Sequence, residues 1–318
     1  MTGLGCKTGN WSLDLAPPWG VTAAIGNCIR QLEIAHADLM PDLHLGPTLI
    51  IASDYGGQHK GSSHEAFSFL LADLQFCWRW DEYRREIRTT RSVQNRRMSY
   101  KALNDQRRQE ALPAFLAAAD VIPGVLATVL INKSFMQALR VTSDERPQLP
   151  EGIARWPARV ITKMTFVAHL GALFIAGLSR EGQNILWMTD NDDFVANDER
   201  VIELTPLFAQ VISQYSQRAM GHFRLGTMKC DNGDLLIEDL ASLPDLAGGA
   251  LCEIPMRGLL PKESPIQLPL RGHLPIKAIT IIKWLSEIGH ALRRVTFVVD
   301  HGDSRARARV RALDFYTD

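Results

Sequence analysis

Three aspartates have the residue type and the sequence context of a binding site for a hard divalent cation. Asp54 ends the apolar run TLIIASD, Asp190 ends the run NILWMTD, and Asp245 lies in PDLAGGAL, where we expect the first turn of a helix. Carboxylate oxygens hold Mg²⁺ while leaving positions open for water and phosphate oxygens. Two such ions can activate a water and stabilise the leaving oxygen of a phosphodiester. If these acids meet at one edge of a sheet, the sequence predicts a metal-dependent nuclease that uses Mg²⁺ or Mn²⁺.

Two glycines follow the first of these acids, in the segment SDYGG. A turn without Cβ atoms would let a phosphate backbone approach the tip of the strand closely. The alternative interpretation of Gly56 and Gly57 is an ordinary turn that closes a hairpin.

The segment from Arg79 to Arg108 is basic and rich in aromatic residues. It holds ten Lys and Arg residues against four Asp and Glu, an excess of six. Arginine forks onto phosphates and aromatic rings stack on bases, so this segment predicts a surface that binds RNA or DNA. The alternative is a solvated helix with ordinary ion pairs. The arginines that we expect to contact nucleic acid are Arg84, Arg88, Arg96, Arg97 and Arg107.

A second basic pattern, RARARVRA, places an arginine at every second residue from Arg305 to Arg311. In a strand these side chains share one face. They form either a basic stripe or the charged protection of an edge strand.

Composition sets broader limits on the function. Lys plus Arg and Asp plus Glu number 35 each in the 318 residues, so overall charge favours neither nucleic acid nor membrane as a partner. Five cysteines include no C-x-x-C pair, which fits reduced thiols in the cytoplasm. The longest apolar stretch, 164–178, is shorter than the roughly 20 residues that cross a bilayer. No G-x-S-x-G or G-x-G-x-x-G pattern indicates a serine hydrolase or a dinucleotide site.

The elements that must position these residues alternate between strands and helices, which predicts an α/β fold. We expect a hairpin of two strands around the glycine turn, a strand-like segment at 96–103, and a long helix that ends at Leu178. A helix and a strand pair should follow the proline-rich stretch 255–275. The expected division is an N-terminal helical extension (1–47), a core (48–252) and a C-terminal helix with strands packed on that core (253–318).

The order of these motifs resembles that of bacterial ribonuclease-H-like proteins of unknown function. The matching segments are SDYGG, the strand AFSFLLA, the triplet SYK, LINK, WMTD and SLPDLAGGAL, which together cover about 48–251. The resemblance implies a mixed sheet flanked by helices, with Asp54, Asp190 and Asp245 converging at one edge. One departure is that Ser99 stands where the family has a glutamate.

The resemblance also implies roles for individual residues. Asp54, Asp190 and Asp245 would be catalytic and would bind the metal, with Lys101 and Lys133 balancing charge or contacting phosphate. Asp193 is the fourth ligand that we expect, with Asp192, Glu65 and Glu86 as alternatives to it. The partner would be RNA or DNA, and the protein could also form a homo-oligomer or bind another protein. Two other functions stay open, namely a binding or assembly protein that has lost catalysis and a phosphohydrolase that acts on a nucleotide.

Overall fold

The computed structural model describes residues 19–316 except for a set of short segments, and all structural statements below concern the described residues. The segments left out are 37–38, 60, 92, 94–95, 143–144, 146–148, 191, 217, 232, 262–265, 268–272 and 304–306. Arg305 of the basic pattern therefore lies outside the described residues.

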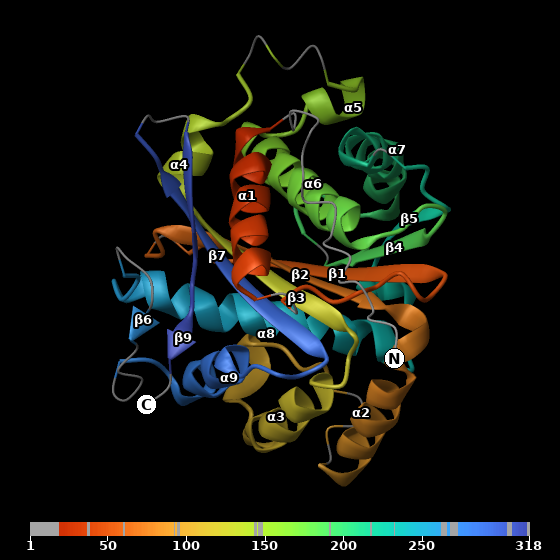
Figure 1. Cartoon of the computed structure of the whole chain (residues 1–318), viewed down its shortest axis with the longest axis vertical. Helices are drawn as coiled ribbons and strands as arrows, with labels where there is room; N and C mark the ends of the chain where they lie inside the picture. Colours follow the sequence, from red (N-terminus) through yellow and green to blue (C-terminus); the bar gives the residue numbers. More distant parts are fainter. Residues whose placement is uncertain are drawn as a thin grey trace.

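Seven strands form one mixed sheet in the order β5-β4-β1-β2-β3-β7-β8 (Figure 1). The strands are β1 (Thr48–Gly56), β2 (His64–Asp73), β3 (Gly124–Asn132), β4 (Asn184–Thr189), β5 (Phe223–Thr227), β7 (Leu292–His301) and β8 (Ala308–Ala312). Two further short strands, β6 (Ile266–Gln267) and β9 (Phe315–Tyr316), pair with each other.

The strand directions bring five strand ends to one edge of the sheet. β1 pairs antiparallel with β2, as expected of the hairpin, and β2 pairs antiparallel with β3. β4 pairs parallel with β1, and β5 pairs parallel with β4. β7 pairs parallel with β3. The carboxyl ends of β1, β3, β4, β5 and β7 therefore share one edge, which we term the carboxyl edge.

Helices cover both faces of the sheet (Figure 1), so the expected α/β architecture with a mixed sheet flanked by helices is confirmed. On one face lie α1 (Gly20–Ala35), α6 (Ala158–Leu178) and α7 (Asp198–Tyr215). On the other lie α2 (Trp78–Thr90), α3 (Gln106–Ala119), α8 (Leu236–Met256) and α9 (Ile276–Ser286). Two short helices are α4 (Lys133–Ala138) and α5 (Glu151–Ala154), and 3-10 turns span Leu74–Cys77, Lys101–Asn104 and Met228–Cys230.

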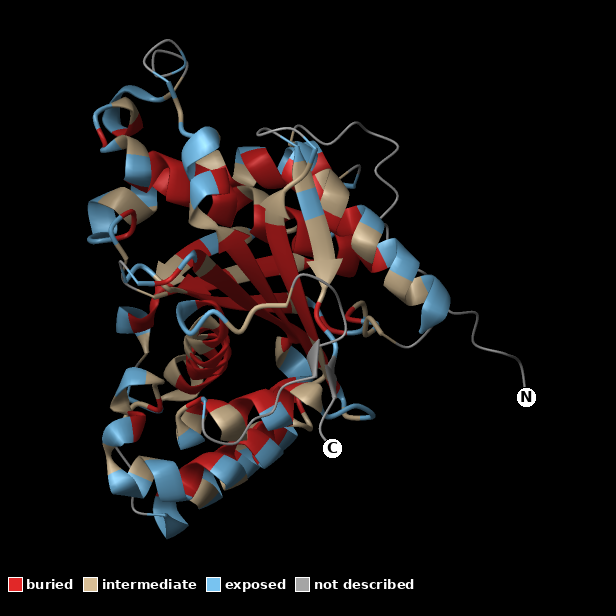
Figure 2. Cartoon of the chain, turned by 90° about the vertical axis from the view of Figure 1, so that its left-hand side faces the viewer, coloured by how far each residue is buried: buried red, intermediate tan, exposed pale blue. Residues whose placement is uncertain are grey.

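Alternation along the strands divides the buried side chains into two cores, and Figure 2 shows the central strands buried along their length. In β2, Phe67 and Phe69 face α6, whereas Ala66 and Leu70 face α8. The same period of two applies to β1. Asp54 and the residues two and four positions before it in β1 therefore face the α8 side of the sheet.

Among the described residues, α6 is the helix that is long and apolar enough to cross a membrane. Its most apolar window is 83% buried inside the protein, so it packs as a core helix between the sheet and its neighbours.

A buried ion-pair cluster fixes α2 against the start of α8. Asp239 on α8 is fully buried, and its carboxylate accepts hydrogen bonds from Arg84 and Arg88 on α2. The Arg88 guanidinium also donates to the backbone carbonyls of Val93 and Arg96, at 3.1 and 3.3 Å. Through these contacts one buried carboxylate fixes both the helix that carries Asp245 and the segment that leads to Arg97.

Two expectations about local structure are wrong. The segment around Ser99 is not a strand but an irregular stretch followed by the 3-10 turn at Lys101–Asn104, because its backbone pairs with no neighbouring strand. Helix α8 begins at Leu236, so Asp245 lies in the helix interior rather than in its first turn. Pro244, the residue before it, is accommodated inside the helix.

Replacing Asp239 with Ala should destabilise the protein by about 3–5 kcal/mol, because it leaves two guanidinium groups inside the protein without their shared carboxylate. Urea denaturation followed by far-UV circular dichroism measures the change. Asp234→Ala is the matched control, since Asp234 pairs with the same Arg84 but has a side chain that is 53% exposed. An equal effect of the two changes would contradict a special role for the buried pair.

Candidate active site

Asp54 and Asp190 are neighbours on adjacent parallel strands. Ser53 of β1 lies opposite Thr189 of β4, and the Asp190 backbone N–H donates to the Ser53 carbonyl at 3.2 Å. Asp54, one residue on, is 9% exposed, whereas the Asp190 side chain is 31% exposed. The parallel register therefore places one buried and one accessible carboxylate at the carboxyl edge.

Asp245 reaches this edge because α8 packs unusually close to its neighbours. A Cβ at Gly248 would lie 2.9 Å from the Ser68 hydroxyl on β2, and a Cβ at Gly249 would lie 2.3 Å from the Tyr100 ring. The Asp245 carboxylate accepts a hydrogen bond of 2.7 Å from the Tyr100 backbone N–H. The small residues of PDLAGGAL thus allow the helix to present Asp245 beside the strand ends.

One of the two glycines that follow Asp54 serves the same packing. Gly57 has a φ of +85°, and a Cβ there would lie 2.7 Å from the His64 carbonyl oxygen. A Cβ at Gly56 would make an ordinary van der Waals contact with Cys252 of α8, at 3.9 Å. Protein atoms and the positive φ therefore account for Gly57, but they do not require a glycine at position 56.

The three carboxylates interact electrostatically. Burial raises the pKa of Asp54 well above its ordinary value, and the charges of Asp245 and Asp190 raise it further, against the opposing charges of Arg97 and Lys163. Burial also raises the pKa of Asp245, to about 6, although the hydrogen bond from Tyr100 lowers it. The negative charge of these carboxylates is therefore only partly compensated by the nearby positive charges.

Arg97 lies among these acids. One guanidinium nitrogen is 3.3 Å from an Asp190 carboxylate oxygen. Burial lowers the pKa of Arg97, but the charges of Asp190, Asp245 and Asp54 outweigh burial and leave this pKa above its ordinary value. An arginine expected to bind nucleic acid is thus a counter-cation of the aspartates.

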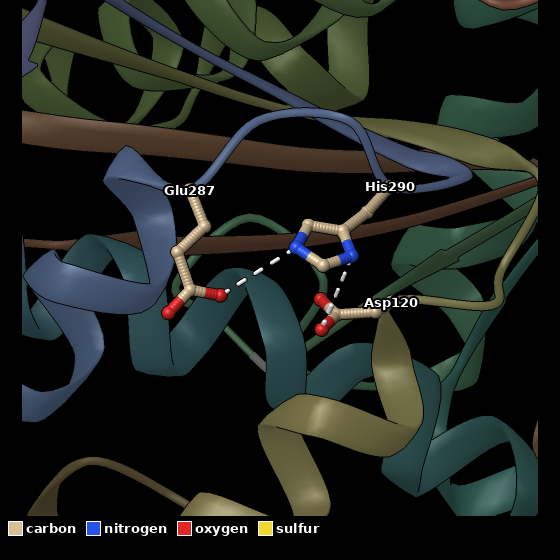
Figure 3. Close-up of side chains that lie close together, drawn as sticks. All are labelled: Asp120, Glu287 and His290. Carbon is tan, nitrogen blue, oxygen red and sulfur yellow. Dashed lines mark ion pairs between the residues drawn. The ribbon is translucent and has the colours of Figure 1, made fainter.

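The donor types at this site suit Mg²⁺ or Mn²⁺, because it holds three carboxylates and two of them are buried. In the part of the chain that the structure describes, however, the group with three potential ligand atoms within 4.8 Å of one another is Asp120, Glu287 and His290 (Figure 3), and the oxygens of Asp54, Asp190 and Asp245 do not all lie that close together. The Asp120 carboxylate is already bound by Arg294 and by the Trp284 indole N–H at 2.8 Å. We interpret that group as an ion-pair network that joins α3 to β7.

The other residues expected at the site, Lys101, Lys133, Asp192 and Asp193, are not among the groups that most affect Asp54 or Asp245. Lys133 follows β3 at the carboxyl edge, and its ammonium donates to the His59 carbonyl at 2.6 Å. Lys101 is exposed on the 3-10 turn after Tyr100. Asp193 pairs with Arg159 at 2.7 Å, and Asp192 pairs with the buried Lys163.

Of the two remaining alternatives for a fourth ligand, Glu65 faces α6 with Phe67, on the opposite face of the sheet from Asp54. Glu86 is exposed on α2.

The arginines expected on a nucleic-acid surface are divided by the fold. Arg84 and Arg88 are 0% and 6% exposed and are bound to Asp239, so we correct their assignment: they join α2 to α8 and cannot reach a phosphate. Arg96 is partly exposed and pairs with Asp105 at 3.1 Å, and Arg107 is exposed on α3.

Two features of the carboxyl edge were not predicted. Lys163 is 6% exposed on α6, and its ammonium lies 5.2 Å from the centre of the Tyr55 ring, next to Asp54 in sequence. The sequence did contain a signal for this residue, because a lysine within an apolar helix, among residues such as Met164 and Phe166, is expected to be buried.

The second feature is a hydrogen-bonded chain around His64. His64 is 2.9 Å from the Ser63 hydroxyl and 3.1 Å from Asp300. The Asp300 carboxylate also accepts from Arg311 at 3.1 Å, and its pKa is lowered to about 2, because these partners outweigh its burial. Asp300 on β7 therefore links β2, through His64, to β8, through Arg311. Arg311 of the basic pattern is thus bound within the protein by this ion pair.

Comparisons of the chain with protein-family models, with curated proteins and with solved structures gave no match. We therefore infer the function from the chemistry of the site itself.

Replacing Asp245 with Asn should stabilise the protein near pH 7.5. The folded-state pKa of about 6 lies above the ordinary 3.8, so this acid favours folding below about pH 4, and that contribution is lost as pH rises through 6. At about 1.4 kcal/mol per pKa unit, the gain is at most about 3 kcal/mol. Asparagine keeps an acceptor for the Tyr100 N–H.

Urea denaturation at pH 7.5 and pH 4.5 measures this effect, and the gain should shrink at the lower pH. Asp42→Asn is the control, because Asp42 has a side chain that is 64% exposed. Destabilisation by Asp245→Asn at pH 7.5 would show that its charge is well compensated after all.

Proposed function

We propose that this protein is a divalent-metal-dependent nuclease with a ribonuclease-H-like core that cleaves phosphodiester bonds of RNA or DNA. The observation that carries this proposal is the grouping of Asp54, Asp190 and Asp245: burial raises the pKa of Asp54, and the charges of Asp245 and Asp190 raise it further. Ordinary structural carboxylates avoid such grouping, since each like charge destabilises the others. Groups with strongly shifted pKa values gather at functional sites.

The fold supports the same proposal. The motif resemblance implies a mixed sheet flanked by helices in which two strand ends and a late helix supply the acids. β1, β4 and α8 supply them here, at one carboxyl edge. Fold alone does not assign a reaction, so the aspartates bear the greater weight.

Asp54, Asp190 and Asp245 are the residues that would hold Mg²⁺ or Mn²⁺. When bound, such an ion supplies an activated water and stabilises charge on phosphate oxygens. The carboxylate of Asp190 is partly accessible to solvent, while Asp54 is held by β1 and Asp245 by the Tyr100 N–H. Arg97 must leave Asp190 for the acids to act as ligands, and its guanidinium could then contact a phosphate.

We also propose a cytoplasmic location. The described cysteines, Cys28, Cys77, Cys230 and Cys252, form no disulfide, which supports a reducing environment.

Replacing Asp54 with Asn should abolish cleavage of single-stranded and duplex RNA and DNA, because it removes the central ligand without changing the shape of the side chain. It should also remove the rise in melting temperature that Mn²⁺ gives the wild type. A fluorescent-substrate assay and a thermal-shift titration measure the two effects. Asp42→Asn should retain both, and cleavage that survives in Asp54→Asn would exclude this mechanism.

A second candidate function is a binding or assembly protein that keeps the fold without catalysis. It is favoured by Arg97, which provides the aspartates with a built-in cation, and by Ser99 in place of the expected glutamate. In this case the guanidinium is a permanent part of the structure.

The change Arg97→Ala separates the two candidates. If Arg97 is a permanent counter-cation, its loss should destabilise the protein by about 1–3 kcal/mol, because the acids lose a hydrogen-bonded partner. Added Mn²⁺ should then have no effect on the wild type. If the acids form a metal site, Arg97→Ala should bind Mn²⁺ more tightly than the wild type, as isothermal titration calorimetry would show.

A further inference from the structure

A basic cavity opens at the carboxyl edge on the α6 side of the sheet, and we term it the α6-side cavity. Its volume is about 290 Å³. Four cationic side chains line it, Lys133, Arg140, Arg159 and Lys163, together with the acids Glu65 and Asp193. Its lining carries a formal charge of +2, four cations against two acids.

Two of these cations are already committed to acids, and two are not. Lys163 pairs with Asp192, and Arg159 pairs with Asp193 at 2.7 Å. Within the described residues, no carboxylate lies within 4.0 Å of the Lys133 ammonium or the Arg140 guanidinium. Among the described residues, the hydrogen-bond partner of the Lys133 ammonium is an uncharged carbonyl, that of His59. Glu65 in the lining is affected by the charge of Lys133, so the four cations face three acids, Glu65, Asp192 and Asp193, and one positive charge in excess is left to attract an anion.

The cavity adjoins the aspartate site across the sheet. The buried Lys163 ammonium lowers the pKa of both Asp54 and Glu65, although burial raises both. It lies over Tyr55, whose side chain faces α6 while that of Asp54 faces α8. Lys163 therefore stands between the two sites.

The remaining lining suits a nucleobase and its sugar. Met136 and Val160 provide apolar surface, and Gln58 and Gln137 provide amides that can both donate and accept hydrogen bonds. The Glu65 carboxylate can accept from an amino group of a base. Small-molecule sites combine apolar walls with a few polar groups, and this volume is just below their usual range of about 300–1,000 Å³, so it is too small for a duplex.

We propose that the α6-side cavity binds one nucleotide, with Lys133 and Arg140 on its phosphate and Met136 and Val160 against its base. This inference rests on the proposed function, because it makes the nucleotide a neighbour of the bond that the aspartates would cleave. A free mononucleotide would satisfy the same contacts, so the experiment must distinguish the two sources.

The test is binding in EDTA, where no cleavage occurs. The probes are a fluorescein-labelled 12-residue single strand, as RNA and as DNA, followed by anisotropy, and unlabelled AMP and GMP as competitors. The double variant Lys133→Ala/Arg140→Ala should bind the strand about tenfold or more weakly than the wild type. Its salt dependence should fall by about 0.7 for each lost phosphate contact.

A matched double variant controls for net charge. Arg30→Ala/Lys283→Ala also removes two positive charges, from exposed positions on α1 and α9, and should bind within about twofold of the wild type. Arg140→Glu is the second variant, since the Arg140 side chain is exposed. Arg140→Glu should weaken binding of the labelled strand at least as much as Arg140→Ala does.

The outcomes separate this inference from the nuclease proposal. Weaker binding by the double variant supports the cavity even if the wild type cleaves nothing, in which case only the nuclease proposal fails. Unchanged binding by both cavity variants overturns the inference, even if the wild type is an active nuclease. Competition by AMP or GMP at the affinity of the strand would identify a free nucleotide as the ligand, and failure to compete would identify the strand.

Discussion

The packing of three carboxylates at one sheet edge is the constraint on which the rest of the structure depends. Burial and mutual repulsion both raise the pKa of Asp54, so ionising this carboxyl group in the folded state costs free energy. The protein tolerates it because the position of each acid is fixed by independent backbone contacts. The parallel register fixes Asp54 and Asp190, and the Tyr100 N–H holds Asp245.

A comparison within the chain shows that this arrangement is not a general property of its buried acids. Asp239 is more deeply buried than Asp54, and burial raises its pKa too, but two arginines from α2 share its carboxylate and oppose that shift. The charges of Asp54 and Asp245 are opposed by Arg97, which is bonded to Asp190, and by the ammonium groups of Lys163 and Lys277. Both groups lie along α8, so one helix carries a paired acid near its start and a poorly paired acid in its middle. Such a difference is the pattern expected when one site stabilises the fold and the other is kept for binding.

The sequence predicted the parts of the site that depend on strand ends. Asp54 and Asp190 close apolar runs, and strands of like direction end at a common edge, so their proximity follows from pattern and topology. The start of α8 was missed because Pro244 is typical of the first turn of a helix, whereas here it sits in the interior. Whether each arginine is buried or exposed was harder to predict. Arg84 and Arg88 are four residues apart with Trp80 on the same helical face, a spacing that fits a buried face as well as a basic surface.

Arg97 could not be placed from sequence, because its position depends on contacts distant along the chain. Arg88 binds the carbonyls of Val93 and Arg96 just before it, and Asp245 binds the N–H of Tyr100 just after it. Asp239 in turn holds Arg88, so α8 fixes the segment of Arg97 at both ends. The same helix therefore sets the position of an acid and of the cation that opposes it. The competition between Arg97 and any other cation for the aspartates is thus built into the packing of α8, rather than added by a surface loop.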